Sequence, residues 1–268
     1  MHSLRARATT TRWLALWALA CTLALGSASA WAQLAGNIER LDGQATITSP
    51  SGDTAANVGA AVNQGDRITT QSQAELVLKM ADGGVLALRP NSQIVIDRFS
   101  YVPNGRPDEQ GYLVKLLVGG LRSVTGAIGK INPKGVRFFT PTATVGIRGT
   151  DFEVSVIETD TPEATAGTYN RVFTGKTYLE NSQGQQVDVG ANETAYAPLN
   201  VVLMASQFGL LKGPAASLLQ KVFPGGRFDN SLNNLQNEAI NRAQTEVNKA
   251  VPSEVRKLLP NLKDLFRR

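Results

Sequence analysis

Residues 140–152 read TPTATVGIRGTDF, and this stretch carries the most distinctive pattern of the chain. Pro141 fixes the start of a strand in which apolar and polar or small residues alternate. One face takes Ala143, Val145 and Ile147, and the other takes Thr142, Thr144, Gly146 and Arg148. Gly149 then permits a turn or bulge that redirects the chain into a second run, Phe152 to Ile157. The stretch therefore predicts two strands joined at a glycine.

Arg148 lies among small residues in this pattern, which predicts that its side chain lies against the fold. A guanidinium in that position needs a carboxylate or several carbonyls, and Asp151 or Asp66 are the candidates. We expect Arg148 to act as a structural clamp rather than as a ligand contact. Its replacement by alanine should then destabilise the fold by a few kcal/mol, because the buried partner loses its pair.

From Gly36 to about Pro198 the sequence consists of short β-type runs separated by Gly, Asn and Asp turns, which predicts a mainly β fold. In the run Glu75–Met80 the even-numbered residues are apolar, so we expect one packed face and one largely wet face. Glycines at 43, 52 and 59 are echoed at 175, 184 and 190, which favours a stacked, coil-like arrangement. Both a solenoid and a sandwich remain open.

The character of the sequence changes after Pro198. Apolar residues at three- and four-residue steps from Asp229 to Val251 predict an amphipathic helix, and Ser253 to Phe266 predicts a second. These helices either cover the β domain, pair with each other or bind a partner. The residues that would contact a partner are Leu232, Leu235, Ile240 and Val247. The predicted organisation is a leader over 1–32, a β domain over 36–156, a β continuation and repeat unit over 157–198, and an apolar linker with helices over 199–268.

The first 32 residues have the three parts of a signal peptide: a basic stretch, an apolar run from Trp13 to Leu25, and small residues up to Ala32. We expect cleavage after Ala32, with Ala30 as the competing site. The apolar run is shorter than the roughly 20 residues of a spanning helix, which argues against an uncleaved anchor. No later run is long enough to span, so we expect a periplasmic or secreted product.

Composition restricts the chemistry of the exported chain. The single His, the single Cys and the three Trp all lie within the leader. Their loss excludes Ser/His/Asp and Cys/His nucleophiles, zinc sites of His/Cys type and disulfides. We expect no cofactor and no metal. Of the 27 basic residues, three arginines leave with the leader, so 24 face 22 acidic residues, and this near balance argues against a nucleic-acid partner.

Carboxylates are the acid and base groups that remain, so glycan cleavage is the chemistry to consider. Asp151 and Glu153 are two apart on a strand and would share a face. Such acids in β proteins usually belong to turns or solvated faces, and we therefore do not expect an enzyme. Glycan binding without cleavage is the alternative, supported by tyrosines at 101, 112, 169, 178 and 196 and weakened by the absence of Trp.

Four motifs together resemble the FecR-type periplasmic domain. They are GDRITT at 65–70, DG at 82–83, GGLR at 119–122 and the stretch 140–152, in the order that family shows. The resemblance spans about Gly36 to Val156, and Ile147 departs from it where valine is usual. The positions it implies to be fold-defining are Asp66, Thr140, Pro141, Arg148, Gly149 and Thr150.

The resemblance implies a non-catalytic module of the cell envelope, related to regulators that relay signals to sigma factors. The leader runs straight into the β domain, so we expect no sigma-binding segment before it. Protein binding or scaffolding, with a signal-sensing role, is the function we expect, and an envelope protein is the expected partner. A cell-wall or surface polysaccharide is the alternative ligand, and the oligomeric state stays open.

Overall fold

The computed structural model describes residues 33–230 together with residues 232 and 234. This part of the chain is mostly β-structure. The strands, in chain order, are β1 (Leu34–Asp42), β2 (Ala45–Ser49), β3 (Gly52–Ala55), β4 (Ala61–Asn63), β5 (Arg67–Thr70), β6 (Glu75–Met80), β7 (Val85–Leu88), β8 (Gln93–Ser100), β9 (Gly111–Val124), β10 (Val136–Phe139), β11 (Ala143–Ile157), β12 (Gly167–Asn181), β13 (Gln186–Val189), β14 (Thr194–Pro198) and β15 (Gly209–Leu210). The helical elements are α2 (Ala127–Ile131), α3 (Val201–Gln207), α4 (Ala216–Val222) and the 3-10 turns η1 (Pro107–Glu109) and η2 (Pro133–Gly135).

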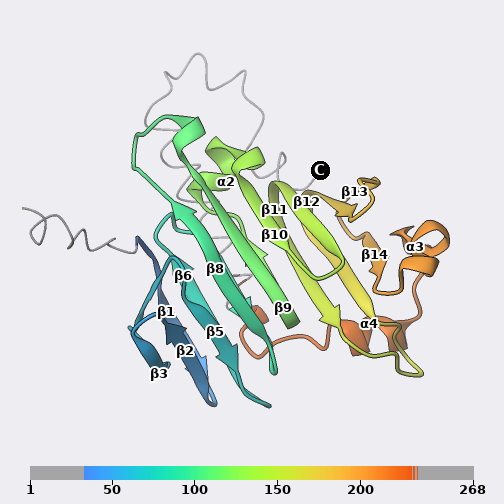
Figure 1. Ribbon diagram of the computed structural model, residues 1–268, viewed down its shortest axis with the longest axis horizontal. Coiled ribbons are helices and arrows are strands. Elements are labelled where there is room, and N and C mark those ends of the chain that lie inside the picture. Colours follow the sequence, from blue (N-terminus) through green and yellow to red (C-terminus); the bar gives the residue numbers. More distant parts are fainter. Residues whose placement is uncertain (1–32, 231, 233, 235–268) are drawn as a thin grey trace, which may run out of the picture. The chain divides into compact units, whose positions relative to one another are not determined.

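These strands form one mixed sheet (Figure 1). Its longest path runs β15-β14-β12-β11-β10-β9-β7-β6-β1-β4. A branch of β3, β2, β5 and β8 joins the same sheet at β9, and β13 pairs with β12. Among the described strands the pair β9 and β10 is parallel, and the other pairings are antiparallel. The mainly β fold predicted from the alternating runs is confirmed.

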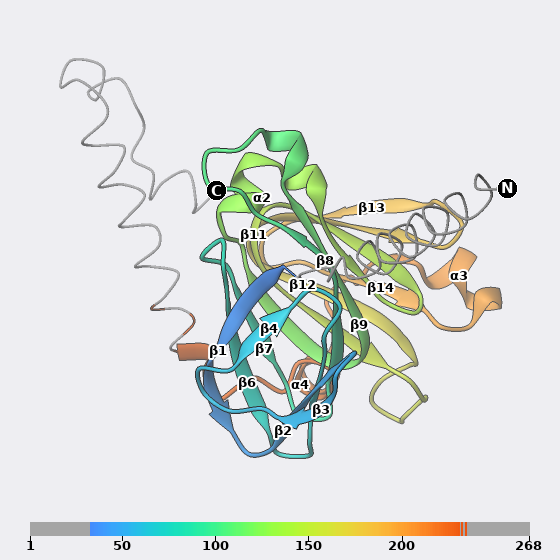
Figure 2. The same ribbon diagram turned by 60° about the vertical axis from the view of Figure 1, so that its left-hand side comes forward.

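Three long strands change partners halfway along their length. The first half of β9 pairs with β8 and β10, and its second half pairs with β7 and β11. Glycines with positive φ mark these changes: Gly119 in β9 (+85°), Gly149 in β11 (+66°) and Gly175 in β12 (+79°). Glycine adopts such angles without a steric penalty, and a bulge there bends a strand. The sheet therefore curves, as the two views in Figures 1 and 2 show.

The curvature lets both halves of the sheet contribute to one hydrophobic core. Ile68 of β5 and Ile94 of β8 belong to the same buried cluster as Leu76 of β6 and Leu86 of β7. Phe152 of β11 lies edge-on to Phe138 of β10, with ring centroids 5.0 Å apart. The described strands form one mixed sheet whose two halves share this core. Stacked parallel coils are not observed among them, because every pairing except that of β9 with β10 is antiparallel.

The middle glycine of each triplet lies at a hairpin turn rather than in a stacked coil. Gly52 is at the turn between β2 and β3, which pair with each other, and Gly184 is at the turn between β12 and β13, which also pair. Both glycines have positive φ. The similarity of the two segments therefore reflects two tight hairpins, for which glycine is the favoured turn residue.

The alternation expected in β6 is confirmed on one face, and on the other it holds for the exposed Lys79 but not for Glu75 and Val77. Leu76, Leu78 and Met80 are buried in the main core. The opposite face was expected to be wet, but Val77 is 1% exposed and Glu75 is 5% exposed. Residues far along the chain cover them, since Val77 packs in one cluster with Leu232. Period-two alternation identifies the two faces of a strand and does not reveal what lies over each.

Asp82 ties the turn after β6 to helix α2. Its carboxylate accepts hydrogen bonds from the backbone N–H of Gly84 at 3.0 Å and of Ile128 at 3.1 Å. Burial raises the pKa of Asp82, although these backbone hydrogen bonds oppose the rise.

Within the described residues, every helix is too short or too polar to cross a bilayer.

Candidate functional site: a buried charge network

A row of charged side chains lies on the sheet face that points away from the main core. Arg122 of β9, Glu153 of β11 and Arg171 of β12 occupy directly opposed positions on neighbouring strands. Arg89 follows β7, and Asp151 lies two residues before Glu153. Charged residues are rarely buried unless they are paired, yet Arg89, Arg122, Asp151 and Glu153 are each at most 4% exposed.

The bulge at Gly149 places the two acids on this face. Before it, the odd-numbered residues Val145 and Ile147 point into the main core, and after it the even-numbered Phe152 and Val154 do so. The register between β11 and β12 shifts between Arg148 and Asp151. One extra residue reverses the side to which later side chains point. Asp151 and Glu153 therefore share a face, as the sequence indicated, and that face is buried and lined with arginines.

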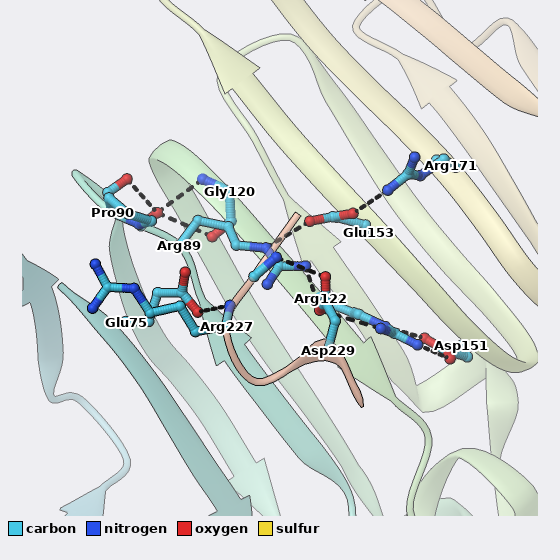
Figure 3. A network of polar contacts seen from close by, with 12 residues as sticks. Glu75, Arg89, Pro90, Gly120, Arg122, Asp151, Glu153, Arg171, Arg227 and Asp229 are labelled. Carbon is cyan, nitrogen blue, oxygen red and sulfur yellow. Dashed lines mark hydrogen bonds and ion pairs between the residues drawn. The ribbon is translucent and has the colours of Figure 1, made fainter. Parts of the chain in front are cut away.

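Arg122 and Asp151 form a two-point ion pair (Figure 3). The Nε of Arg122 donates to Oδ1 of Asp151 at 2.9 Å, and its Nη2 donates to Oδ2 at 2.6 Å. This bidentate geometry fixes the plane of the guanidinium as well as its position. Burial raises the pKa of Asp151, while the hydrogen bonds from Arg122 oppose the rise.

Glu153 is held by two arginines, one on each oxygen. The Nε of Arg89 donates to Oε1 at 2.7 Å, and the Nη2 of Arg171 donates to Oε2 at 2.7 Å. The guanidinium of Arg171 also lies over the rings of Phe173 and Phe223, at 4.7 and 4.5 Å from their centroids. Contacts of this kind between arginine and aromatic faces are attractive. Glu153 thus joins the Arg89 side of the network to the Arg171 side.

A segment from beyond the sheet completes the network. We call residues 223–230 with Leu232 the cover segment. Oδ1 of Asp229 accepts from Nη2 of Arg89 at 2.8 Å and from Nη1 of Arg122 at 3.2 Å. Its Oδ2 accepts from the backbone N–H of Gly226 at 2.7 Å. Figure 3 shows Asp229 reaching the arginines from the segment that crosses in front of the strands.

Other contacts hold the cover segment at both ends. Phe223 packs with Tyr169 and Tyr196 in one cluster, and Leu232 packs with Val77 in another. Near Asp229, the backbone N–H of Arg227 donates to Glu75 at 2.8 Å, and its side chain forms an ion pair with Asp42.

Gly226 lets the cover segment approach the network closely. A Cβ at that position would lie 1.5 Å from Nη1 of Arg89. Because Arg89 is held by Glu153 and Asp229, it cannot swing aside without losing an ion pair. A residue without a side chain is therefore required where the segment passes over this arginine.

The cover segment adds a carboxylate to the arginines of the network. Arg89, Arg122 and Arg171 pair with Asp151 and Glu153, and Asp229 is a further carboxylate partner of Arg89 and Arg122. The buried Glu75 lies beside the segment and accepts from the N–H of Arg227. Burial by itself lowers the pKa of Arg89, but Glu153 and Asp229 outweigh it and raise that pKa. Burial also lowers the pKa of Arg122, but Asp151 and Asp229 outweigh it and raise that pKa. The arginines stay charged, and the arrangement is suited to holding a carboxylate rather than to moving a proton.

The positions carried over from the resemblance lie at turns and bulges. The buried carboxylate of Asp66 accepts from the N–H of Asn63 at 2.8 Å. The hydroxyl of Thr140 donates to the carbonyl of Ala143 at 2.9 Å, next to the exposed Pro141. Thr150 is buried, and its backbone N–H donates to the hydroxyl of Thr125 at 3.0 Å. None of these side chains belongs to the charge network.

The clamp expected at Arg148 is wrong. Arg148 is exposed, and among the described residues it has no ion-pair partner. It faces Lys176 on β12, which is also exposed, so both cations point to solvent. Its two candidate partners are engaged elsewhere, Asp151 by Arg122 and Asp66 by the backbone of Asn63. The bulge at Gly149 separates Arg148 from the buried acids, which the alternation alone did not reveal.

Replacing Arg148 with alanine is expected to change the free energy of unfolding by less than about 0.5 kcal/mol, because an exposed side chain without a partner contributes little. The facing Lys176 makes a small gain in stability the expected direction, since like charges opposite each other are unfavourable. Urea unfolding of the two chains measures this difference. A loss above about 2 kcal/mol would restore the clamp and contradict the exposed position.

Leu232, the first of the four residues expected to contact a partner, does not face a partner. It is 1% exposed and packs with Val77, Val85 and Ala87, so it covers this chain's own sheet. The other three residues of that expectation, Leu235, Ile240 and Val247, lie outside the described residues. The leader with its cleavage sites, and the second predicted helix, lie outside them as well.

The tyrosines do not form an exposed platform. Tyr112, Tyr169 and Tyr196 are each at most 4% exposed, and Tyr101 and Tyr178 are partly buried. Stacking on a sugar requires an accessible aromatic face.

Within the described residues, no group of three or more His, Cys, Asp or Glu side chains is placed to hold a metal ion.

Sequence reasoning did not identify the arginines of the network or Asp229 as a site. Arg122 was noticed within the GGLR motif, and Asp229 was noticed as the start of a predicted helix. One signal was present: Arg89, Arg122 and Arg171 end or interrupt apolar runs that otherwise read as buried strands. A buried arginine requires a carboxylate. Which carboxylate serves which arginine depends on the strand register.

The architecture and the network together describe a mainly β domain with a buried polar face. Residues 66–176 match the family model described as FecR protein, and the chain contains a FecR domain over that segment. The domain includes Arg89, Arg122, Asp151, Glu153 and Arg171, whereas Asp229 lies beyond it.

Two crystal structures of a proposed anti-sigma factor from Parabacteroides distasonis ATCC 8503 are similar to this chain. One has a TM-score of 0.41 and 18% identity, and the other has a TM-score of 0.39 and 19% identity. In both cases the match covers 58% of this chain and 62% of the other, so it spans less than two thirds of that protein. No curated protein matches this chain.

Replacing Asp229 with asparagine is expected to lower stability by about 1–3 kcal/mol at neutral pH, the usual contribution of hydrogen bonds to charged groups. Burial raises the pKa of Asp229, but Arg89, the N–H of Gly226 and Arg122 outweigh it, so its pKa lies below the ordinary 3.8. A lowered pKa in the folded state gives stability that is complete above the unfolded value and is lost as the pH falls through the folded value.

The difference in the free energy of unfolding between the unchanged chain and the Asp229→Asn variant should therefore shrink below about pH 3.8. Urea unfolding at pH 7 and at pH 3 measures it. Because both chains keep Asp151, whose pKa is shifted the other way, the difference isolates Asp229. A difference that stays constant between the two pH values would contradict an ionised Asp229 as the closing group.

Proposed function

We propose that this protein is an exported, non-catalytic regulatory module of the cell envelope whose FecR domain binds polypeptide. One observation carries the proposal: a buried face of the domain holds a carboxylate that comes from outside the domain, through Arg89 and Arg122. The FecR family assignment supports a signalling or regulatory role. The leader pattern of residues 1–32 supports export.

The state of the buried acids supports binding over catalysis. A glycan-cleaving pair needs one carboxylic acid that donates a proton and one carboxylate that acts as base or nucleophile. Both oxygens of Asp151 accept from Arg122, and the two oxygens of Glu153 accept from Arg89 and Arg171. Because their oxygens already accept from arginines, these two carboxylates are poorly placed to donate a proton or to attack a substrate. Arg89 and Arg122, by contrast, already bind the carboxylate of Asp229, so they can bind a carboxylate of a polypeptide.

The experiment is cross-linking in intact cells that express the full chain, followed by identification of the captured molecule and measurement of its binding to the purified chain. A specific envelope protein that also binds the purified chain supports the proposal. Retention on cell-wall or surface polysaccharide, without a protein partner, would move the assignment to glycan binding. A chain carrying Phe152→Ala, which removes a core side chain, is the control for capture that does not depend on the fold.

A further inference from the structure

We propose that Arg89 and Arg122 form a receptor for an acidic peptide segment of a partner protein, and that Asp229 fills this receptor within the chain until the partner's carboxylate displaces it. The inference rests on the proposed function and specifies the chemistry of its partner. It would make the cover segment a competitor that sets how much partner is bound.

The receptor is held in shape without Asp229. Arg122 is fixed in its plane by two hydrogen bonds to Asp151, and Arg89 is fixed through Nε by Glu153. Nη2 of Arg89 and Nη1 of Arg122 converge on a single oxygen of Asp229. A pair of guanidiniums fixed in advance loses little freedom when a carboxylate binds, which favours affinity.

Charge supplies the second argument. When Asp229 is removed, Arg89 and Arg122 each lose one ion pair on a largely buried surface. A buried cation that loses a partner is unfavourable, so the vacated site favours another anion. A neutral or basic peptide would leave these two ion pairs broken. The partner is therefore acidic at the position that replaces Asp229.

The way in which the cover segment is attached makes exchange feasible. Within the described residues, no backbone-to-backbone hydrogen bond joins the cover segment to a strand. Side chains hold it instead, through Phe223, Asp229 and Leu232, together with the N–H of Arg227 on Glu75. Asp229 itself remains 25% exposed. Release breaks these contacts and leaves the sheet intact.

The cover segment also indicates which peptides fit. The N–H of Asp229 donates to the carbonyl of Gly226 at 3.1 Å, and its carboxylate accepts from the N–H of Gly226. The glycine at this place is required by the closeness of Arg89. A competing segment therefore carries a Gly-x-x-Asp turn, with an apolar residue three positions after the aspartate, as Leu232 stands to Asp229.

The test uses a labelled synthetic peptide with the sequence of residues 223–234 and a matched peptide in which asparagine replaces the aspartate. Both are titrated against the exported chain, from residue 33 to 268, and against its variants Asp229→Ala, Leu232→Ala and Asn230→Ala. Asp229→Ala empties the receptor, and Leu232→Ala loosens the cover segment without touching the arginines. Asn230 is exposed and serves as the matched control.

We expect Asp229→Ala to bind the acidic peptide about tenfold or more tightly than the unchanged chain, and the asparagine peptide to lose about tenfold on that variant, since hydrogen bonds to charged groups are of that size. Leu232→Ala should also bind more tightly, and Asn230→Ala should bind as the unchanged chain does. Circular dichroism and unfolding curves establish that each variant is folded. Acetate should compete with the acidic peptide.

The proposal is overturned if Asp229→Ala binds both peptides equally, or binds the acidic one no more tightly than the unchanged chain does. These results leave the proposed function standing if an envelope protein is still captured in cells. Conversely, peptide exchange without a protein partner in cells would support the receptor and contradict the envelope function. The two failures are therefore distinguishable.

Discussion

Replacing Asp151 with alanine is expected to lower the free energy of unfolding by about 3–5 kcal/mol, the usual cost of breaking a buried ion pair by removing one partner. Arg122 is 4% exposed and donates two hydrogen bonds to this carboxylate, at 2.9 and 2.6 Å. Without Asp151 it keeps the 3.2 Å contact with Asp229, which already serves Arg89. The buried cation is then left partly uncompensated.

Two comparisons make this prediction specific. Arg106 pairs with Asp108 and Glu109 on the surface, where its side chain is 72% exposed, so Arg106→Ala should cost less than about 1 kcal/mol. Replacing both members of the buried pair, by Arg122→Met with Asp151→Leu, should recover much of the loss, because apolar side chains of similar volume leave no unpaired charge. Denaturant unfolding of each variant measures these changes in the free energy of unfolding. A cost for Asp151→Ala no larger than that for Arg106→Ala would contradict the buried pair.

Replacing Phe152 with alanine is expected to cost about 3–5 kcal/mol, because the change removes a buried ring and leaves a cavity. Phe152 is fully buried, and its ring meets Phe138 edge-on at an interplanar angle of 82°. It is also the first inward-pointing residue of β11 after the bulge, where the two halves of the sheet share their core. Its loss weakens the contact between those halves.

The matched control for Phe152 is Val202→Ala, since Val202 is 83% exposed and its truncation should change stability by less than about 0.5 kcal/mol. Phe152→Leu, which keeps most of the volume, should fall between the two. Thermal and denaturant unfolding give the three values. Equal stability of the Phe152 and Val202 variants would show that Phe152 lies outside the core.

The strands were predictable because their signal is local. Alternation in the run Glu75–Met80 and the turns that follow it depend on neighbouring residues, and the inward-pointing leucines are where the pattern put them. The bulge was anticipated from Gly149, but its effect on later residues was not. Arg148 was assigned to the fold because small residues surround it in the sequence, but it lies at the surface beside Lys176.

The charge network was beyond the reach of the pattern because its members are distant in sequence. Arg122 and Asp229 are 107 positions apart, and Arg89 and Asp229 are 140 apart. Nothing near Asp229 in the sequence indicates an arginine partner, and its position before an apolar run predicts a helix cap equally well. The same distance explains why the second face of β6 was expected to be wet.

The sequence by itself determined that this chain is mainly β, that it carries the motifs of a FecR domain, and that histidine and cysteine chemistry is confined to its first 32 residues. These properties follow from composition and from periods of two residues. The tertiary structure decided which charges are buried, which of them pair, and that Asp229 completes the site from outside the domain. Strand register, a one-residue bulge and long-range packing set those contacts, and each depends on residues that meet only when the chain is folded.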